Sequence, residues 1–311
     1  MKLAMVFPGQ GSQSVGMLNG YAGLPGVDDV RREAGEALGA AFLGLMDEGP
    51  AEALGLTINT QPAMVTAGYA AYCAWRALGG AEPDMVAGHS LGEYTALTAA
   101  SALSFRDCLP LVRYRAQAMQ EAVPEGQGAM AAILNLDDAA VRAACAESAQ
   151  GEVVEAVNFN APGQIVIAGS KAAVERAMQA CKAKGARRAV SLPVSAPFHS
   201  ALMRPAAERL GSYLADVTVS VPKFPLVNNV DVKVETQPPA IKSALVRQAA
   251  SPVRWVETVQ KMRADGVTHV LECGPGRVLA GMVKRIDGAL QVHALSDRAS
   301  LEQALASVKE G

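Results

Sequence analysis

The chain has few of the features that mark secreted, membrane-spanning or metal-binding proteins. Its 311 residues include five cysteines, an odd number, and no two of them form a C-x-x-C pair. This excludes a fully paired disulfide framework and the usual cysteine spacing of a structural zinc site. No apolar run approaches the roughly 18 residues that span a bilayer, and the apolar start at residues 3–7 is too short for a secretion signal. We therefore expect a cytoplasmic protein without a membrane partner.

Charge is sparse and nearly balanced, which limits the partners of the chain. Only 19% of residues are charged, and 28 Lys and Arg against 30 Asp and Glu give a formal net charge of −2. A surface that binds nucleic acid is therefore not expected, although a local basic patch for an acidic partner stays open. Hydrophobic residues make up 50% of the chain, which is long enough for one large core or two modest ones. This composition is typical of a helix-rich α/β protein.

The pentapeptide GHSLG at residues 88–92 fits the G-x-S-x-G pattern of a nucleophile elbow. An apolar run at 85–87 predicts a strand before it, and residues 91–100 predict a helix after it. In such a unit the serine hydroxyl stands above the sheet edge, and the next backbone N–H lies at a helix N-terminus that stabilises negative charge. The pattern therefore predicts Ser90 as a nucleophile. A glycine-containing loop with an incidental serine is the alternative.

The two ends of the chain predict a larger α/β unit. Residues 3–7 indicate a buried strand, and helical spacing indicates helices at 62–78 and 105–122. Residues 268–272 indicate another strand, which the Gly-Pro-Gly sequence at 274–276 separates from a following helix.

The middle of the chain predicts a small inserted subdomain. Strand, helix, strand, strand, helix and strand are indicated in turn by residues 129–134, 137–149, 153–157, 164–168, 171–184 and 189–192. The two central strands are expected to form a hairpin around a turn at 160–163. This β-α-β-β-α-β order is the ferredoxin-like pattern. The chain is expected to re-enter the larger unit near residues 193–197.

Four histidines are available as the base that a serine nucleophile needs. His269 and His293 lie in apolar, strand-like runs and are expected to be structural. His89 precedes the serine directly and is expected to point away from its hydroxyl. His199 lies in an irregular, proline-containing loop at 194–200, and catalytic groups concentrate in such loops. His199 is therefore the predicted base, with a structural loop histidine as the alternative.

Acyl chemistry also needs an orienting group for the histidine and donors for the oxyanion. The aspartates between the serine and the histidine in chain order fit helix starts better than a triad; they are Asp107, Asp137 and Asp138. A Ser–His dyad with a neutral acceptor is the simpler prediction. The N–H of Leu91 follows from the elbow geometry, and the glycine-flanked loop at 9–11 offers a second donor, although such a loop is also typical of a tight turn.

Six sequence blocks carry a resemblance to a known family. They are FPGQGSQ at 7–13, GHSLGEY at 88–94, RAQAMQ at 115–120, NFNAPGQ at 158–164, PFHS at 197–200 and SPVRW at 251–255. With these blocks in this order, the chain resembles the malonyl-CoA:acyl carrier protein transacylases of bacterial fatty-acid synthesis along essentially its whole length. The resemblance implies an α/β-hydrolase-like catalytic core at 1–126 and 194–311 and a ferredoxin-like subdomain at 127–193, in agreement with the predicted elements.

The resemblance also implies catalytic roles for matching positions. Ser90 would be the acylated nucleophile and His199 the general base. The backbone carbonyl of Gln248 would orient the histidine, which accounts for the missing acid. Backbone N–H groups of Gln10 and Leu91 would bind the oxyanion.

Further positions are implied for the substrate and the partner. Arg115 would bind the free carboxylate of the malonyl group, since a planar guanidinium pairs with a carboxylate through two parallel hydrogen bonds. The other implied substrate-binding residues are Met119, Asn160, Gln164, Arg188 and Phe198. Some relatives carry serine in place of Phe198, whose ring should narrow the acyl pocket against branched groups. Lys284 and Arg285 are candidates for docking an acidic acyl carrier protein.

The implied enzyme transfers a malonyl group from malonyl-CoA to the phosphopantetheine thiol of acyl carrier protein. The transfer passes through a malonyl-serine intermediate, releases coenzyme A, and needs neither a cofactor nor a metal. A serine hydrolase would share the elbow, and a non-catalytic module that binds carrier proteins could share the fold. Acyltransferases of polyketide or malonate-decarboxylation pathways would share the chemistry.

Overall fold

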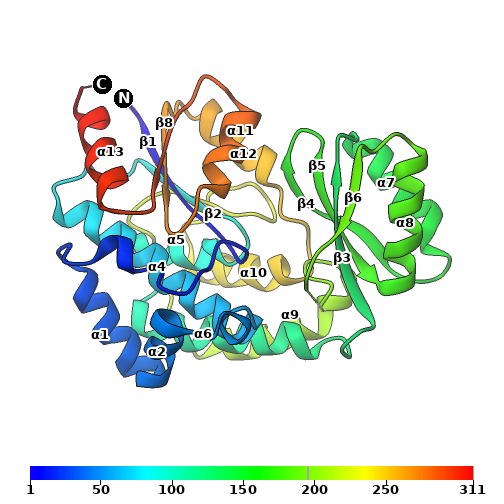
Figure 1. Cartoon of the computed structure of the whole chain (residues 1–311), viewed down its shortest axis with the longest axis horizontal. Coiled ribbons are helices and arrows are strands. Elements are labelled where there is room, and N and C mark those ends of the chain that lie inside the picture. Colours follow the sequence, from blue (N-terminus) through cyan, green and yellow to red (C-terminus); the bar gives the residue numbers. More distant parts are fainter. Residues whose placement is uncertain (195, 311) are drawn as a thin grey trace.

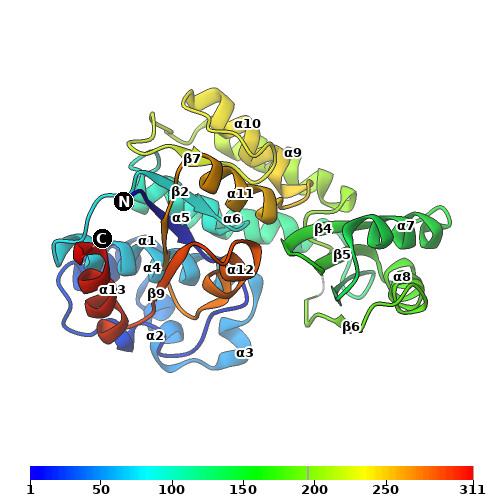
Figure 2. The same cartoon turned by 90° about the horizontal axis from the view of Figure 1, so that it is seen from above.

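The computed structural model describes residues 1–194 and 196–310. Figure 1 and Figure 2 show two units: a larger one that contains both chain ends and a smaller one formed by the middle of the chain. Residue 195, in the loop where the chain is expected to re-enter the larger unit, lies outside the described residues.

The larger unit is built on a parallel sheet with the strand order β7-β2-β1-β8-β9. Its strands are β1 (Leu3–Phe7), β2 (Met85–Gly88), β7 (Leu226–Val227), β8 (His269–Cys273) and β9 (Gln291–Leu295). In the central strand, Phe7 pairs with Gly88 on one side and Val6 with Glu272 on the other. Because the strands run in one direction, their carboxyl ends meet at a single edge, where open parallel sheets place ligand sites.

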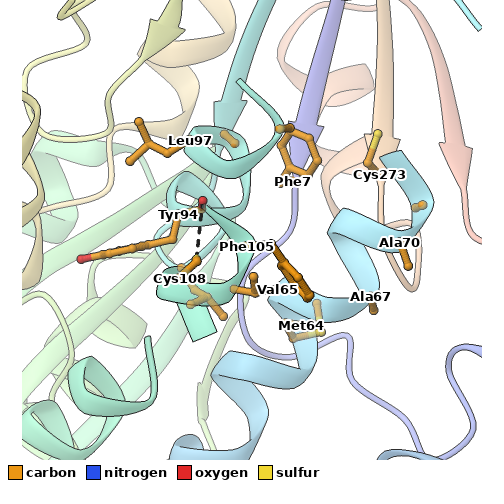
Figure 3. Close-up of a cluster of buried hydrophobic side chains, with 14 of the residues drawn as sticks. Phe7, Met64, Val65, Ala67, Ala70, Tyr94, Leu97, Phe105, Cys108 and Cys273 are labelled. Atoms are coloured by element: carbon orange, nitrogen blue, oxygen red, sulfur yellow. Dashed lines mark hydrogen bonds between the residues drawn. The ribbon is translucent and has the colours of Figure 1, made fainter. Parts of the chain in front are cut away.

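Both faces of this sheet are buried, and the two-residue period of β1 distributes its side chains between them. Leu3, Met5 and Phe7 pack in one apolar cluster, and Ala4 and Val6 pack in another. Figure 3 shows Phe7 among the side chains of the helices on its face of the sheet.

Helices cover each face of the sheet. On the Phe7 face lie α4 (Thr57–Ala77) and α5 (Gly92–Ala99), with α6 (Phe105–Glu121) packed against α4. The opposite face is covered by α11 (Trp255–Ala264) and α12 (Val278–Ile286). The remaining helices of this unit are α1 (Val27–Leu38), α2 (Ala40–Glu48), α3 (Ala51–Leu54), α9 (Arg204–Ala215), α10 (Pro238–Ala249), α13 (Arg298–Glu310) and the 3-10 turns Asn19–Tyr21 and Ala201–Met203. None of the helices described for residues 1–194 and 196–310 is long and apolar enough to cross a membrane.

The smaller unit is an antiparallel sheet with the strand order β4-β5-β3-β6. In chain order its elements are β3 (Gly128–Leu134), α7 (Asp138–Ala149), β4 (Val154–Ala161), β5 (Gln164–Ser170), α8 (Lys171–Ala183) and β6 (Arg188–Ser191). One face of the sheet packs under α7 and α8. The other face carries Met130, Val157 and Val166, which pack with Phe198 from the loop that follows the unit.

Backbone hydrogen bonds join the two units. The N–H of Phe159 donates to the carbonyl of Val253 (3.0 Å), and the N–H of Val253 donates to the carbonyl of Val157 (2.8 Å). This parallel bridge brings β4, with the buried residues Asn158 and Asn160, to the carboxyl edge of the larger sheet.

The mixed α/β class is confirmed, and the predicted strands and helices occur in the predicted order. The extent of the turn predicted at 160–163 is wrong, because β4 continues to Ala161 and only Pro162 and Gly163 form the turn. Asn160 lies in the strand because its neighbours Phe159 and Ala161 pair with β5, and its buried side chain is hydrogen-bonded to His89 of the larger unit at 2.8 Å. A polar residue near a turn dipeptide therefore marks a contact between the units here, rather than a loop.

Candidate active site

Ser90 lies at the sharp turn between β2 and α5, with a positive φ of 52°. A Cβ atom on Gly88 would lie 1.9 Å from the carbonyl carbon of Gly92, and one on Gly92 would lie 1.9 Å from the carbonyl oxygen of Phe7. Only glycine fits at both positions, so the G-x-S-x-G pattern reflects the close approach of helix and strands. A non-glycine residue with positive φ is strained, which means that the surroundings hold Ser90 in this conformation.

The hydroxyl of Ser90 is hydrogen-bonded to a buried histidine. Ser90 Oγ lies 2.7 Å from His199 Nε2, and His199 Nδ1 lies 2.9 Å from the backbone carbonyl oxygen of Gln248. A carbonyl only accepts, so Nδ1 carries the proton and Nε2 is left as the acceptor that faces the hydroxyl. The histidine is therefore held in the tautomer that can take a proton from the serine.

Burial and the positive charge of Arg115 together lower the pKa of His199 to about 3. The imidazole is thus neutral across the physiological range, which is the form that a general base requires.

Arg115, on α6, is only 1% exposed. Its Nη1 donates to Gln61 Oε1 (2.8 Å), and its Nη2 donates to Ser90 Oγ (3.1 Å) and to Gln248 Oε1 (3.1 Å). Its Cζ lies 5.3 Å from the centre of the Tyr94 ring. Burial lowers the pKa of Arg115, but a guanidinium stays charged in proteins. Because its hydrogen-bond acceptors are neutral groups, this cation beside the serine would gain from an incoming anion.

A pocket opens beside Ser90, and both units form its walls. The larger unit contributes the loop after β1, the elbow, α6 and the first turns of α12, and the smaller unit contributes strands β3 to β5. The predicted site residues that line it are Gln10, Ser90, Leu91, Arg115, Met119, Asn160, Phe198 and His199. Apolar residues on its wall include Met130, Val166, Leu192, Val278 and Met282.

The two predicted oxyanion donors lie on adjoining loops. A Cβ atom on Gly9 would lie 2.7 Å from the carbonyl oxygen of His89, so the loop after β1 directly touches the elbow. The side chain of Gln10 donates to Thr57 Oγ1 (3.1 Å). In the part of the chain that the structure describes, the backbone N–H groups of Gln10 and Leu91 have no protein acceptor. Both residues line the pocket, so these groups are available to a substrate oxygen.

Other predicted residues lie outside the pocket lining. Gln248 is fully buried behind the pocket and reaches it through its contacts with His199 and Arg115. Gln164, at the start of β5, accepts a hydrogen bond from Arg285 (2.6 Å) at the junction of the units. Arg188 is exposed at the start of the edge strand β6.

Lys284 and Arg285 are exposed near the end of α12. Arg285 also donates to the carbonyl of Pro162 (3.1 Å), so it links α12 to the β4–β5 turn of the smaller unit.

His89 lines the same pocket but bonds to Asn160 rather than to the serine. Its ring lies 5.6 Å from the ring of Trp255, and burial lowers its pKa. This arrangement agrees with the expectation that His89 points away from the hydroxyl. His269 and His293 lie in β8 and β9, as their strand-like surroundings predict.

Three buried polar residues around the elbow escaped the sequence analysis: Gln61, Glu93 and Asn229. Glu93 stands inside the GHSLGEY block, so a charged residue among small and apolar ones could have drawn attention to it. Burial raises its pKa to about 7. Gln61 directly precedes the helix predicted at 62–78 and lies inside α4, and Asn229 lies in a segment without a recognisable pattern. Within residues 1–194 and 196–310, no cluster of His, Cys, Asp and Glu is arranged to hold a metal ion.

Comparisons with known proteins show the family of the chain. The model of the acyl transferase domain family matches residues 4–295. The chain is 54% identical to the malonyl CoA-acyl carrier protein transacylase of Escherichia coli K12, over 98% of this chain and 99% of that protein. Among solved structures, it is similar to the acyl-carrier-protein S-malonyltransferase of Burkholderia pseudomallei 1710b, with 62% identity, a TM-score of 0.97 and coverage of 98% and 100% of the two chains. It is also similar to a malonyl-transacylase solved in complex with its type II PKS acyl-carrier protein, with 51% identity, a TM-score of 0.97 and coverage of 99% and 100%.

Proposed function

The chain belongs to the acyl transferase family, among its malonyl-CoA:acyl carrier protein transacylases, and from this premise we propose which of its residues carry out the transfer. The enzyme moves a malonyl group from malonyl-CoA to the phosphopantetheine thiol of acyl carrier protein through a malonyl-serine intermediate. One observation carries the assignment of residues: the same oxygen, Ser90 Oγ, lies within hydrogen-bond distance of both a neutral imidazole and a buried guanidinium.

In the first half-reaction, Ser90 Oγ attacks the thioester carbonyl while His199 Nε2 takes the hydroxyl proton. The N–H groups of Gln10 and Leu91 donate to the oxyanion of the tetrahedral intermediate. The carbon–sulfur bond then breaks, and the proton on His199 passes to the sulfur of coenzyme A. The Gln248 carbonyl accepts from Nδ1–H throughout and stabilises the imidazolium.

In the second half-reaction, the thiol of the phosphopantetheine arm attacks the malonyl-serine ester. His199 takes the thiol proton and returns a proton to Ser90 Oγ when the ester bond breaks. A thioester replaces a thioester overall, so the reaction consumes no redox equivalent. The same N–H groups donate to the oxyanion in both half-reactions.

We propose that Arg115 selects malonyl groups by binding their free carboxylate. An acetyl group would leave the guanidinium buried among neutral partners, whereas a carboxylate can form two parallel hydrogen bonds with it. Met119, Phe198 and Asn160 would enclose the acyl and thioester portion. Gln164 and Arg188 would contact the outer part of the pantetheine path, and Lys284 and Arg285 the carrier protein.

The order of elements supports a finer description of the fold. Residues 1–126 and 194–311 would form an α/β-hydrolase-like core, and residues 127–193 a ferredoxin-like subdomain, since the strand order β4-β5-β3-β6 suits that pattern. The five cysteines are unpaired thiols, which supports a location in the reducing cytoplasm.

Labelling with malonyl-CoA that carries a radioactive acyl group tests the role of Ser90. Label should remain on the denatured protein and map to Ser90, and Ser90→Ala should lose it. Ser212→Ala is the matched control, because Ser212 is exposed on α9, away from the pocket. Unchanged labelling of Ser90→Ala would remove this serine from the mechanism.

The alternative hypothesis, a serine hydrolase, predicts a different fate for the acyl group. Malonyl-CoA is offered with and without holo acyl carrier protein, and free malonate and malonyl-carrier are measured. Transfer predicts that the carrier raises turnover of malonyl-CoA and receives the label. Equal release of free malonate in both reactions would contradict the proposed function.

A further inference from the structure

A buried set of polar side chains behind the elbow has no part in the reaction described above. Asn229 is 0% exposed, Glu93 is 2% exposed, and the side-chain amide of Gln248 bonds both Glu93 and the backbone of Ser90. Burying polar groups is unfavourable unless they are hydrogen-bonded, so the contacts that these groups make are informative.

The side-chain amide of Asn229 takes the place of a neighbouring strand at the elbow. β7 pairs with β2 only as far as Val227 and Ala87. Beyond that point, Asn229 Nδ2 donates to the carbonyl of Gly88 (2.6 Å), and the N–H of Ser90 donates to Asn229 Oδ1 (2.7 Å). A primary amide carries both N–H donors and a carbonyl acceptor, the two kinds of group that a neighbouring strand would offer. It therefore continues the hydrogen-bond ladder of the sheet around the turn, where a strand could not follow.

Glu93 connects this amide to the groups around the histidine. One of its oxygens, Oε2, accepts from the backbone N–H of Asn229 (2.9 Å) and from Gln248 Nε2 (2.9 Å). Gln248 Nε2 also donates to the backbone carbonyl of Ser90 (3.0 Å). Both backbone polar groups of Ser90 are thus bound by side chains of this cluster.

We propose that Asn229, supported by Glu93, is a positioning residue that holds Ser90 in its strained conformation with its hydroxyl aimed at His199. The inference rests on the proposed role of Ser90 as the nucleophile. A positive φ at a non-glycine residue persists only where the surroundings determine it, and here the N–H and the carbonyl on either side of the strained Cα are each fixed by a buried amide. Without Asn229, the N–H of Ser90 and the carbonyl of Gly88 lose their partners, and the turn can relax toward negative φ.

The first test compares two neighbouring buried amides. Asn229→Ala should lower the rate constant for acylation of Ser90 by roughly a hundredfold, the loss expected when a reacting group is misplaced by about 1 Å. The KM for malonyl-CoA should change by less than about threefold, because the Arg115 site stays intact. Asn228→Ala is the matched control, since Asn228 is 2% exposed in the same loop, and among the described residues its side chain accepts only from the N–H of Asp231. It should lower stability while acylation stays within about threefold of wild type.

Acylation rates are measured by rapid quench. Circular dichroism shows that each variant is folded, and active-site labelling gives the concentration of active protein. Equal losses in the two variants would mean that the loop as a whole is needed, and would overturn the proposal. A normal acylation rate in Asn229→Ala would overturn it as well. If wild-type protein took no label on Ser90, the proposed nucleophile would fail, which is a separate result.

A second variant gives a readout that a merely structural role would not produce. In Asn229→Asp, a protonated carboxyl can donate to Gly88 and accept from Ser90 as the amide does, whereas a carboxylate cannot donate. The ratio of its acylation rate to that of wild type should therefore rise at least about tenfold as the pH falls from 8 to 5. The titratable and charged groups around this site are Glu93, Arg115, His199, Asp231 and Arg247. They are present in both proteins, so the ratio removes the pH dependence that they cause. A ratio that does not change with pH would contradict the assigned donor and acceptor roles.

Discussion

At the scale of single residues, Ser90 Oγ lies between two groups with opposite charge requirements. In the proposed mechanism, His199 must be neutral to take a proton, and Arg115 must be charged to attract a carboxylate. Their closeness satisfies both requirements, because burial and the nearby guanidinium together lower the pKa of His199 and disfavour the imidazolium. In our proposal the base needs no acidic partner, because the backbone carbonyl of Gln248 accepts the hydrogen bond of His199 Nδ1–H in its place.

The low pKa of His199 predicts an unusual pH dependence of acylation. An unperturbed imidazole would lose its basic form as the pH falls through 6.5, the ordinary histidine value. With the pKa lowered to about 3 in the free enzyme, the neutral form persists, so kcat/KM for acylation by malonyl-CoA should stay within about twofold between pH 8 and 5. Rapid-quench labelling at each pH measures it. A decline centred near pH 6.5 would show that His199 titrates normally.

The lowered pKa of His199 also makes the stability of the folded state depend on pH. Between pH 6.5 and 3 the unfolded chain binds a proton at His199 that the folded chain does not, so this residue makes the folded state less stable as the pH falls through that window.

Arg115→Ala should separate the two substrates that differ by one carboxylate. We expect kcat/KM for malonyl-CoA to fall by at least about a hundredfold, because a buried, hydrogen-bonded ion pair is lost, and kcat/KM for acetyl-CoA to fall far less or to rise. Arg113→Ala, two residues away and exposed on the same helix, is the control. Equal losses for both substrates would mean that Arg115 acts only in packing.

Local sequence patterns could predict only some of the residues at this site. The elbow and His199 were predicted from local patterns, because glycine spacing and a proline-rich loop are visible in the chain itself. Gln248 followed only from the family resemblance, since any residue can offer a backbone carbonyl. Asn229 lies 139 positions from Ser90, and an asparagine in an unpatterned loop gives no indication of which strand it will complete.

At the scale of elements, α12 depends on a carboxylate from another element. Glu272 of β8 is fully buried, and its oxygens accept from the backbone N–H groups of Leu279 (3.1 Å) and Ala280 (2.7 Å) in the first turn of the helix. Burial raises the pKa of Glu272, and the helix N-terminus offsets part of that cost. Val278 and Leu279 line the pocket, so this contact also fixes a wall of the site.

Glu272→Ala should therefore destabilise the protein by about 2–3 kcal/mol, because two helix N–H groups lose a charged acceptor. Urea unfolding followed by circular dichroism measures the free energy of unfolding. Glu302→Ala, on an exposed ion pair with Arg298 in α13, should change it by less than about 0.5 kcal/mol. A matching small effect for Glu272 would mean that water replaces the carboxylate at the helix end.

Elements were predicted best where their patterns are long. The strand at Leu3–Phe7 and the helix at Phe105–Glu121 have the predicted positions within a residue. The two-residue strand β7 has no period that a sequence could reveal, yet it is followed directly by the loop that holds Asn229. The end of β4 was misplaced because turn-forming residues directly follow a strand whose polar side chains are buried at the site.

At the scale of the whole molecule, the pocket lies where the two units meet, so neither unit could form it alone. Arg285 joins α12 of the larger unit to the β4–β5 turn of the smaller one. The order of units could be predicted from the change of pattern near residue 127 and the return near 194. Their relative placement could not, because it depends on the bridge between Asn158 and Val253, which are far apart in sequence.

Lys284→Glu tests whether this side of the molecule receives the carrier. We expect the KM for holo acyl carrier protein to rise by about three- to tenfold, with less effect at high salt, because a charge that attracts an acidic partner is reversed. Lys182→Glu, an exposed reversal on α8, is the control for net charge. If both variants change the KM alike, the carrier docks elsewhere.

The position of Arg115 has one more consequence, for the order of events in a catalytic cycle. As long as its charge is unopposed, it weakens the proton affinity of the neighbouring imidazole. If Arg115 binds the malonyl carboxylate as we propose, that negative charge offsets this influence. Acylation of Ser90 would then raise the proton affinity of His199, the proposed base of the second half-reaction. An acetyl group carries no such charge and would leave the proton affinity of His199 unchanged. The enzyme would therefore select malonyl groups both when it binds them and in the rate at which it transfers them to the carrier.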